Sequence, residues 1–536
     1  MNNDKAIDVL IIGAGPAGTA LAIDLARRGL DIRIIEKAPH AFDGSRAKGI
    51  QPRTLEVFQD LDVLHDALAA GSEYPKLGIH LGPLTVPWRM YPHRQPSADI
   101  PFPNTWLIPQ YSTDRALHAR LGRLGRGVEF GTELIELTQG TETVTAKVAG
   151  VDGLEEITSR YVVGADGGSS SVRKQLGITF AGSTDEQDRM VIVDAATTGL
   201  SRDRWHVWPS LRGRFTAACP LPHSDLFQWM IRLAPGEEPQ LGEAQLNQRI
   251  RSHTRNRHIT LHDIQWTSVF RPNIRLAGSY RHGRVFIVGD AAHVHTPFGA
   301  QGMNTGIQDG YNLGWKLEQV LAGADPRLLD SYEAERRPVA AAVLGLSTEK
   351  YNDLSKLDTS SIRRGKDEQQ LALSYHGGPL APVGGDRTKT LRAGDRAPDA
   401  TLLRVDREQV RLFDHYRGPQ FTAIAYGRHA AYALDRLDWP AAGAQLKRLA
   451  VGATAAHADG LLTDDAGAFQ RAYGLTEDTL LLIRPDGYIG HIATQDILTT
   501  TQTAVQALTP PPGGHDMHSL QEQRQRAPQA TVAGAS

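Results

Sequence analysis

The first forty residues alternate between short apolar runs and one amphipathic stretch. Val9 to Ile12 is a run rich in branched apolar residues, which is typical of a buried parallel strand. Apolar residues then recur at helical spacing from Ala20 to Arg28, Gly29 follows, and a second apolar run covers Ile32 to Ile35. The pattern predicts a strand, a helix and a second strand in one βαβ unit.

Two later segments repeat the sequence of strand, glycine-containing loop and helix. Tyr161 to Val163 precedes the loop Gly164–Gly168, a serine-rich turn and a helix that carries Arg173. Val285 to Val288 precedes a loop with His and Gly residues, and a helical region then extends to about Asn352. The late segment therefore returns to the domain that the N-terminus begins.

The intervening and C-terminal segments have other patterns. Residues 181–282 are rich in strand formers and predict a β-sheet layer, and residues 76–104 have poor helical periodicity. From about Thr388 the pattern becomes loop, strand, helix, strand, turn and strand, whereas the residues after Leu508 lack apolar periodicity. A chain of 536 residues suggests about three domains.

We therefore predict an α/β protein with interleaved domains. A Rossmann-like domain takes residues 1–75, 105–180 and 283–352, and a β-sheet substrate domain takes residues 76–104 and 181–282. The remainder is divided into a connector, a third domain and a disordered tail at residues 353–387, 388–508 and 509–536.

Composition and charge exclude several classes of function. The formal net charge is -2, so no overall field favours nucleic acid or an anionic membrane. Cys219 is the one cysteine, which excludes an internal disulfide and fits a reducing cytoplasm; we expect it to be a small buried side chain. The polar N-terminus has no secretory signal, and Val9 to Ala26 contains Asp24 and three glycines, so we expect no membrane span and a cytoplasmic protein.

The first loop carries the spacing of a dinucleotide-binding fingerprint. Gly13 permits a tight turn, Gly15 leaves room for a pyrophosphate, and Gly18 allows the helix to pack on the strand. The helix N-terminus offers unpaired N–H groups to the phosphates, and Glu36 can accept hydrogen bonds from a ribose diol. The fingerprint does not separate FAD from NAD. The predicted dinucleotide contacts here are Gly13, Gly15, Pro16, Ala17, Gly18, Glu36 and Lys37.

Three motifs in order carry a family resemblance: the fingerprint, Asp166-Gly167 before the helix with Arg173, and "GDAAHVHTPFGAQGMNTGIQDGYNLGWKL". Over about residues 5–350 the chain resembles the FAD-dependent group A aromatic hydroxylases, the single-component flavoprotein monooxygenases. The segments "RAPDATL" and "LLLIRPDGYIGHI" resemble the phenol hydroxylase-like branch, which includes aromatic polyketide hydroxylases and ends in a thioredoxin-like domain. No cysteine lies in residues 388–536, so that domain cannot carry out thiol redox chemistry.

The resemblance implies further contacts with non-covalent FAD. Asp290 would accept hydrogen bonds from the ribityl chain, and the N–H groups of Met303 and Asn304 would face the pyrimidine end of the flavin. The family usually has Gly-Gly-Gln-Gly where this chain has Gly299-Ala300-Gln301-Gly302, and the added methyl narrows the approach to the ring. The implied contacts are Arg46, Gln110, Asp166, Gly167, Asp290, Pro297, Gly299, Gly302, Met303 and Asn304, and Arg46 and Pro297 are implied in catalysis.

The implied reaction is hydroxylation of a phenolic or polycyclic aromatic compound. NAD(P)H, with NADPH favoured, reduces the flavin, and molecular oxygen forms a flavin 4a-hydroperoxide that attacks the ring. The chain has no second fingerprint for NAD(P)H and no cysteine pair, which excludes the disulfide reductase class. Four residues are candidates to line the substrate pocket, although aromatic residues in a sheet are more often core: His206, Trp208, Trp229 and Arg271.

Several alternatives stay open at this point. A Baeyer–Villiger or epoxidising monooxygenase acting on a polyketide would share the motifs, and so would a non-catalytic flavin-binding protein. His293 and His295 could be a metal pair, but a hydrogen-bonded loop is the favoured interpretation, and we expect no metal. Arg173 could bind a phosphate or cap a local network. We interpret the charged stretch 363–370 as a solvated linker, and the C-terminal domain as a possible homodimer surface.

Overall fold

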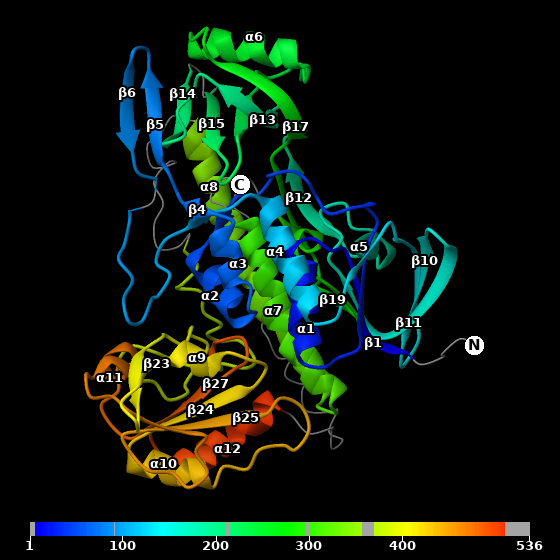
Figure 1. Ribbon diagram of the computed structural model, residues 1–536. Helices are drawn as coiled ribbons and strands as arrows, with labels where there is room; N and C mark the ends of the chain where they lie inside the picture. Colours follow the sequence, from blue (N-terminus) through cyan, green and yellow to red (C-terminus); the bar gives the residue numbers. More distant parts are fainter. Residues whose placement is uncertain (1–5, 91, 211–214, 296–300, 356–368, 510–536) are drawn as a thin grey trace, which may run out of the picture.

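The computed structural model describes residues 6–90, 92–210, 215–295, 301–355 and 369–509. Figure 1 shows three parts in a row. A seven-stranded sheet covered by α6 (Glu243–Thr254) lies at one end, and a C-terminal unit with its own seven-stranded sheet lies at the other. Between them lies an eight-stranded sheet with its helices.

The central sheet is built on the parallel strands that the apolar runs predict. β1 pairs in parallel with β2 on one side and with β11 on the other, and β11 pairs in parallel with β20. The predicted βαβ unit is thus confirmed, with α1 (Pro16–Arg27) between β1 and β2. The strands are β1 (Ile7–Ile12), β2 (Ile32–Glu36), β8 (Val128–Phe130), β9 (Glu133–Gln139), β10 (Val144–Gly150), β11 (Gly153–Gly164), β19 (Arg281–His282) and β20 (Val285–Ile287).

The helix α7 (Gly302–Leu321) runs through the middle of the molecule against α1 (Figure 1). Glycines on one face make this close approach possible, because a Cβ at Gly306 would lie 2.9 Å from the Gly289 Cα, and one at Gly310 would lie 3.0 Å from the Ala17 carbonyl oxygen. The other helices of this part are α2 (Pro52–Asp60), α3 (Leu64–Ala69), α4 (Gln110–Arg123), α5 (Ser171–Gln175) and α8 (Asp330–Ser355), with the 3₁₀ turns η2 (Gly289–Ala291) and η3 (Pro326–Leu329).

The sheet under α6 alternates strictly between two apolar faces. Val193 and Ile231 pack with Leu246 and Ile250 of α6, whereas Ile192 belongs to a second cluster on the opposite face, toward the central part. Its strand order is β17-β13-β16-β15-β14-β5-β6. The strands are β5 (Lys76–Leu81), β6 (Leu84–Trp88), β13 (Met190–Thr198), β14 (Arg204–Pro209), β15 (Phe215–Pro220), β16 (Leu226–Arg232) and β17 (Thr260–Phe270).

Two three-stranded sheets connect this layer to the central part. One is β3-β7-β4, and the other is β12-β18-β21. Their strands are β3 (Gly49–Ile50), β4 (Ser72–Glu73), β7 (Trp106–Leu107), β12 (Phe180–Thr184), β18 (Asn273–Ala277) and β21 (His293–Val294).

The C-terminal unit has a mixed sheet in the order β23-β22-β26-β25-β24-β27-β28. β24 pairs in parallel with β25 and antiparallel with β27. Its elements are β22 (Thr401–Arg404), β23 (Gln409–Arg411), α9 (Leu412–Tyr416), β24 (Phe421–Tyr426), α10 (Arg428–Asp435), β25 (Leu446–Val451), β26 (Gly460–Thr463), α11 (Ala468–Tyr473), β27 (Thr479–Ile483), β28 (Ile489–Ala493) and α12 (Ile497–Leu508).

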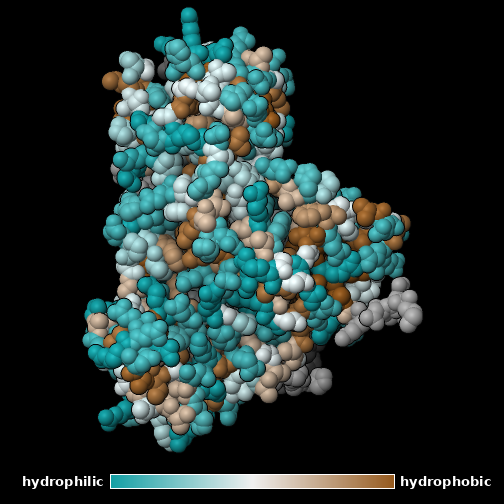
Figure 2. Space-filling model, in the orientation of Figure 1, coloured by the Kyte–Doolittle hydropathy of each residue, from teal (hydrophilic) through white to brown (hydrophobic). Residues whose placement is uncertain are grey.

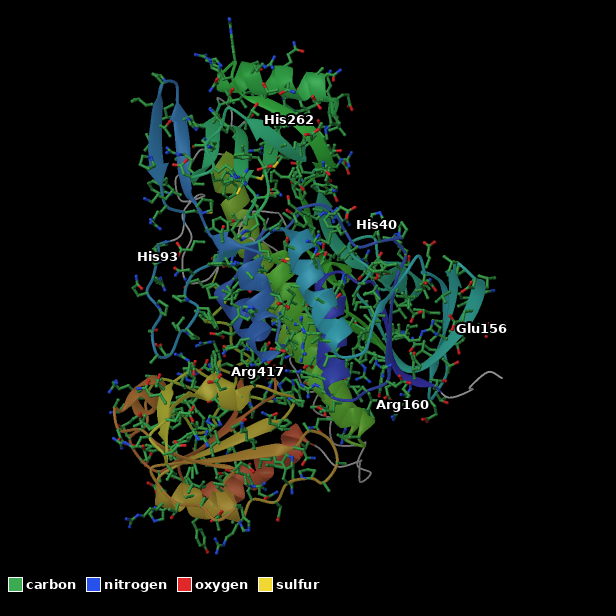
Figure 3. The ribbon with its side chains drawn as sticks, in the orientation of Figure 1. His40, His93, Glu156, Arg160, His262 and Arg417 are labelled. Carbon is green, nitrogen blue, oxygen red and sulfur yellow. The ribbon has the colours of Figure 1, made fainter. Side chains whose placement is uncertain are left out.

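Buried charges join the C-terminal unit to α7 and α8. The Arg484 guanidinium contacts both oxygens of Glu335, at 2.6 and 2.9 Å, and the Lys316 ammonium lies 2.7 Å from the same carboxylate. Burial opposes ionisation of Glu335, but Arg484 and Lys316 outweigh it and hold the pKa at about 2. At the rim, Arg417 pairs with Asp62, where Figure 3 places Arg417 at the boundary of the two parts.

The end of the charged stretch 363–370 corrects a prediction. Residues 363–368 lie outside the described residues, but Gln369 and Gln370 are buried rather than solvated. The Gln370 amide donates to the Gln301 side chain and accepts a hydrogen bond from the Gln308 amide at 2.7 Å, so the segment packs on the start of α7. A polar stretch of sequence suggests exposure to solvent. Glutamine side chains can nevertheless be buried where other residues form hydrogen bonds with their amide groups.

The surface in Figure 2 is mostly polar on the face shown. Apolar side chains gather there over β10 and β11, where Val151 and Leu154 are exposed. Within the described residues, no helix combines the length and the apolar character needed to cross a membrane.

The glycine face of α7 gives a stability prediction. Gly306→Ala should lower the free energy of unfolding by about 1–3 kcal/mol, because the added methyl meets backbone that cannot move aside. Gly345→Ala on α8 is the matched control, since nothing lies within 4 Å of a Cβ there, and it should raise stability by up to about 1 kcal/mol. Denaturant unfolding of both variants measures the difference, and equal effects would contradict the packing argument.

Candidate functional site

The glycine loop after β1 forms a cradle of backbone. A Cβ at Gly13 would lie 2.4 Å from the Ala165 carbonyl oxygen, and one at Gly18 would lie 2.1 Å from the Gly13 carbonyl oxygen. Gly15 is different, because nothing lies within 4 Å of its Cβ position. At Gly13 and Gly18 the loop therefore packs so closely on neighbouring backbone that no side chain fits, whereas the space beside Gly15 is open. This open space fits a pyrophosphate at the N-terminus of α1. Pro16 is the first residue of that helix.

Glu36 orders this loop from the end of β2. Its two carboxylate oxygens accept hydrogen bonds from the backbone N–H groups of Ala14 and Ala38, each at 3.0 Å. The side chain is half-buried and keeps lone pairs for a further donor, whereas Lys37 beside it is exposed. This geometry fits the predicted contact of Glu36 with a ribose.

Asp114 is a functional candidate that the sequence analysis missed. It lies on α4 one turn after Gln110, is 2% exposed, and has one carboxylate oxygen without a hydrogen-bond partner among the described residues. Burial raises its pKa to about 8, against a hydrogen bond from Gln110 that lowers it, and the Glu36 charge raises it further. The i, i+4 spacing from Gln110 was the available signal.

The segment after β20 presents Asp290 to the site. The Asp290 side chain is accessible, yet protein surrounds it so closely that desolvation raises its pKa, while His293 and Arg46 act in the opposite direction. Arg46, which lies 5.5 Å from the Phe42 ring centroid, is exposed and lies close enough to Asp290 to lower the pKa of its carboxyl. Both residues are therefore placed to contact a ligand.

Asp166 and Arg173 hold this segment from α5. Asp166 accepts hydrogen bonds from the Ser170 hydroxyl at 2.5 Å and the Ser171 N–H at 2.7 Å, so its carboxylate caps the helix. Arg173 donates to the carbonyl oxygens of Ala291 and Gly168, both at 2.9 Å. Arg173 could have bound a phosphate or capped a local network, and the structure shows it in the local network. At Gly167, φ is +77° and nothing lies within 4 Å of a Cβ, so backbone is open there.

His293 and His295 belong to a hydrogen-bonded network. The two rings are 2.8 Å apart, nitrogen to nitrogen, and His293 Nε2 lies 2.6 Å from Asp309 on α7. Asp309 also accepts from Arg336 at 2.7 Å; burial opposes ionisation of Asp309, but its interactions with His293 and Arg336 outweigh burial and lower its pKa. The hydrogen-bonded interpretation is confirmed, and no cluster of three metal-binding side chains occurs in the part of the chain described here.

Asn304 ties the start of α7 to the segment around β3. Asn304 is fully buried, donates to the Gly49 carbonyl oxygen at 2.8 Å and accepts from the Gln51 N–H at 2.9 Å. Met303 is partly buried, and a Cβ at Gly302 would lie 3.4 Å from the His295 ring. Pro297 and Gly299 lie outside the described residues.

The structure places the four candidate substrate residues outside the lining of the pocket described below. Trp208 and Trp229 are buried in the cluster under α6, and His206, which shares the face of Trp208 on β14, bonds to His80 and the Ser201 carbonyl. Arg271 is separate and pairs with Glu186 on the surface at 3.0 Å. Successive side chains of a strand point to opposite faces, and the composition of the strands did not reveal which face was which.

The opposite face carries a polar cluster toward the central part. Ser45 donates to Asp194 from its N–H at 2.7 Å and its hydroxyl at 2.6 Å, and Gln228 donates to the Ser45 hydroxyl at 2.5 Å. Lys48 donates to Gln228 and lies 4.5 Å from the Trp205 ring centroid. Cys219 is buried on this face as predicted, and burial raises its pKa to about 11.

A pocket of about 880 Å³ opens beside this cluster. Tyr74 lines it and lies 6.0 Å from Trp205, ring to ring, and Leu107 lines it while pairing with Gly49 on β3. Tyr111 at the start of α4 hydrogen-bonds to Ser224 on its rim. The pocket therefore lies between the central part and the sheet, in the size range of ligand sites. Sequence reasoning missed it because its walls come from five separate segments, at residues 72–77, 85–89, 107, 202–204 and 220–224.

The Asp114 environment predicts a pH effect. A folded-state pKa raised to about 8 means that the stability contributed by the neutral carboxyl is complete below about pH 4 and is lost as pH rises to about 8. Asp114→Asn has no such group. The Tm of this variant relative to the unmodified protein should therefore increase steadily from pH 5 to pH 8 in scanning calorimetry. A difference that is constant across this range would contradict the assignment.

Comparison with known proteins gives the same assignment. A family model described as FAD binding domain matches residues 6–347. A flavin-dependent monooxygenase of Mycobacteroides abscessus is 39% identical over 491 residues, which cover 90% of this chain and 96% of that protein. The 6-methylpretetramide 4-monooxygenase of Streptomyces rimosus is 30% identical over 549 residues, 93% of each chain.

A solved structure extends the likeness to three dimensions. The ternary complex of aklavinone-11 hydroxylase with FAD and aklavinone has a TM-score of 0.78 at 25% identity, over 95% of this chain and 100% of that one. The cradle at Gly15 and the accessible Asp290 fit the cofactor that this fold holds elsewhere. By sequence over nine-tenths of its length, this chain belongs to the FAD-dependent aromatic monooxygenases.

Proposed function

We propose that this enzyme uses NAD(P)H, with NADPH favoured, and molecular oxygen to hydroxylate a polycyclic phenol. The observation that carries the choice of a polycyclic substrate is the pocket of about 880 Å³, which exceeds the needs of a single ring. Relatives named for a pretetramide and for aklavinone support it.

When bound, FAD accepts a hydride from the nicotinamide and transfers one atom of oxygen to the substrate. The chain binds and orients these partners. The Gly15 loop and the N-terminus of α1 hold the pyrophosphate, Glu36 a ribose, and Asp290 the ribityl chain. Asn304 fixes the N-terminus of α7, whose partial positive charge favours an anionic flavin. Arg46, which is exposed and acts on Asp290, is proposed as a catalytic contact.

The remaining assignments belong to the same proposal. We assign residues 388–508 to a thioredoxin-like domain without redox cysteines, and its buried ion pairs with α8 support a structural task. The domain boundaries of the sequence analysis, a homodimer and a cytoplasmic location stay predictions.

Consumption of NADPH and NADH by the purified, FAD-loaded protein tests the proposal. The panel contains single-ring phenols, naphthols and hydroxyanthraquinones, and product mass is recorded for each compound. We expect the polycyclic phenols to stimulate NADPH consumption at least tenfold over the single-ring compounds and to gain one oxygen atom.

Two controls separate the alternatives. The same protein without substrate gives the background rate, and a catalase-coupled assay detects cofactor oxidation that yields hydrogen peroxide instead of product. Bound flavin that NADPH does not reduce with any compound would contradict the proposal, and a ring-expanded product would favour Baeyer–Villiger chemistry.

A further inference from the structure

Lys48 is a buried lysine at the junction of the sheet and the central part. Lys48 is 8% exposed and immediately precedes β3. The next residue, Gly49, accepts the Asn304 hydrogen bond that fixes the start of α7, and pairs with Leu107 on the pocket wall. The backbone of Lys48 is therefore tied to the cofactor site, while its side chain reaches across to the face of the sheet beside the pocket.

The Lys48 ammonium is incompletely satisfied. An ammonium carries three N–H donors. Among the described residues, Gln228 supplies the only oxygen acceptor, and the other neighbours are the Met230 sulfur at 3.9 Å and the Trp205 ring centroid at 4.5 Å. A thioether is a weak acceptor, and a ring face offers cation–π attraction alone. A buried cation with such neighbours is stabilised by an anion.

In the part of the chain that the structure describes, no anionic side chain contacts the Lys48 ammonium directly. The titratable groups that face Lys48 are Cys219 on β15 and Asp194 on β13. Burial keeps the Cys219 thiol neutral, with a pKa of about 11. The Asp194 carboxylate receives two hydrogen bonds from Ser45, which hold it in place on the far side of the Gln228 amide.

We propose that Lys48 binds the ionised ring hydroxyl of the substrate as an ammonium–phenolate pair. This inference rests on the proposed function, which names no residue that recognises the substrate hydroxyl, and it assigns that role to Lys48. A phenolate ring donates electrons more strongly than a phenol, so the pair favours attack by an electrophilic oxygen. On binding, the phenol O–H bond breaks, and its proton passes to solvent, or to the Lys48 amine where that is neutral. Both routes give the same pair.

The pocket lies next to the surroundings of Lys48. Tyr74 on the pocket wall lies 6.0 Å from Trp205, and the same Trp205 ring lies 4.5 Å from the Lys48 ammonium. Trp205 and Lys48 are buried and do not line the pocket, so a flat polycyclic phenol seated against Tyr74 reaches Lys48 only when the side chains around Trp205 move aside. The substrate class that follows is a polycyclic compound with an acidic phenol or enol, and neutral ring ethers are excluded.

Dye binding tests this inference apart from turnover. The probe is alizarin, a hydroxyanthraquinone whose phenolate absorbs at longer wavelength than oxidised flavin. Absorbance is followed against pH with the FAD-loaded protein. We expect the protein to bind the dye as phenolate and to lower its apparent pKa by at least about one unit. Lys48→Met should bind the dye about 10- to 100-fold more weakly and as the neutral phenol, and Lys48→Arg should restore phenolate binding in part.

Matched measurements keep the outcomes distinct. Lys147→Met on β10, far from the pocket, should behave as the unmodified protein, and FAD content and Tm report the folding of each variant. Lys48→Met that binds the phenolate as tightly as the unmodified protein would overturn the inference, and so would an unmodified protein that binds the neutral dye or none. Flavin reduction by NADPH without the dye is read separately, so its failure would count against the proposed function instead.

Discussion

Close packing of α7 against α1 is the constraint on which the rest of this structure depends. Gly306 and Gly310 bring the helix to within backbone contact of Gly289 and Ala17, so the loop after β20 is fixed relative to the fingerprint loop after β1. Both loops lie at the carboxyl ends of parallel strands, where α/β sheets bind their ligands. The relative position of these two loops thus depends on glycines, because a larger residue at position 306 or 310 would push α7 away from them.

Buried polar contacts then fix α7 along its length. Asn304 ties its first turn to β3, Asp309 pairs with His293 and Arg336 near its middle, and Lys316 joins Glu335 and Arg484 toward its end. Buried ion pairs contribute little net stability, but losing one partner is strongly destabilising, which makes the arrangement specific. The C-terminal unit takes part in this network through Arg484, which gives a domain without cysteine a structural connection to α7.

The sequence was informative where the signal is local. Apolar runs and glycine spacing predicted β1, α1 and β2, and the buried Cys219 followed from residue type alone. The sequence did not reveal which face of each strand points toward the central part. Trp205 and Trp208 are of the same residue type, yet they lie three positions apart and so on opposite faces of one strand. Asp114 and Lys48 gain their character from burial among distant segments, which a linear pattern does not record. The buried Gln369 and Gln370 depend in the same way on partners that the fold supplies.

The proposed reaction adds a hydroxyl to an aromatic ring of the substrate, with the flavin at the N-terminus of α7. Turnover under labelled molecular oxygen, with the position of the label determined in the product, is the direct test of this reaction. We expect one labelled atom in a new hydroxyl on the aromatic ring and the second labelled atom in water. A label recovered only in hydrogen peroxide, or within an expanded ring, would contradict it.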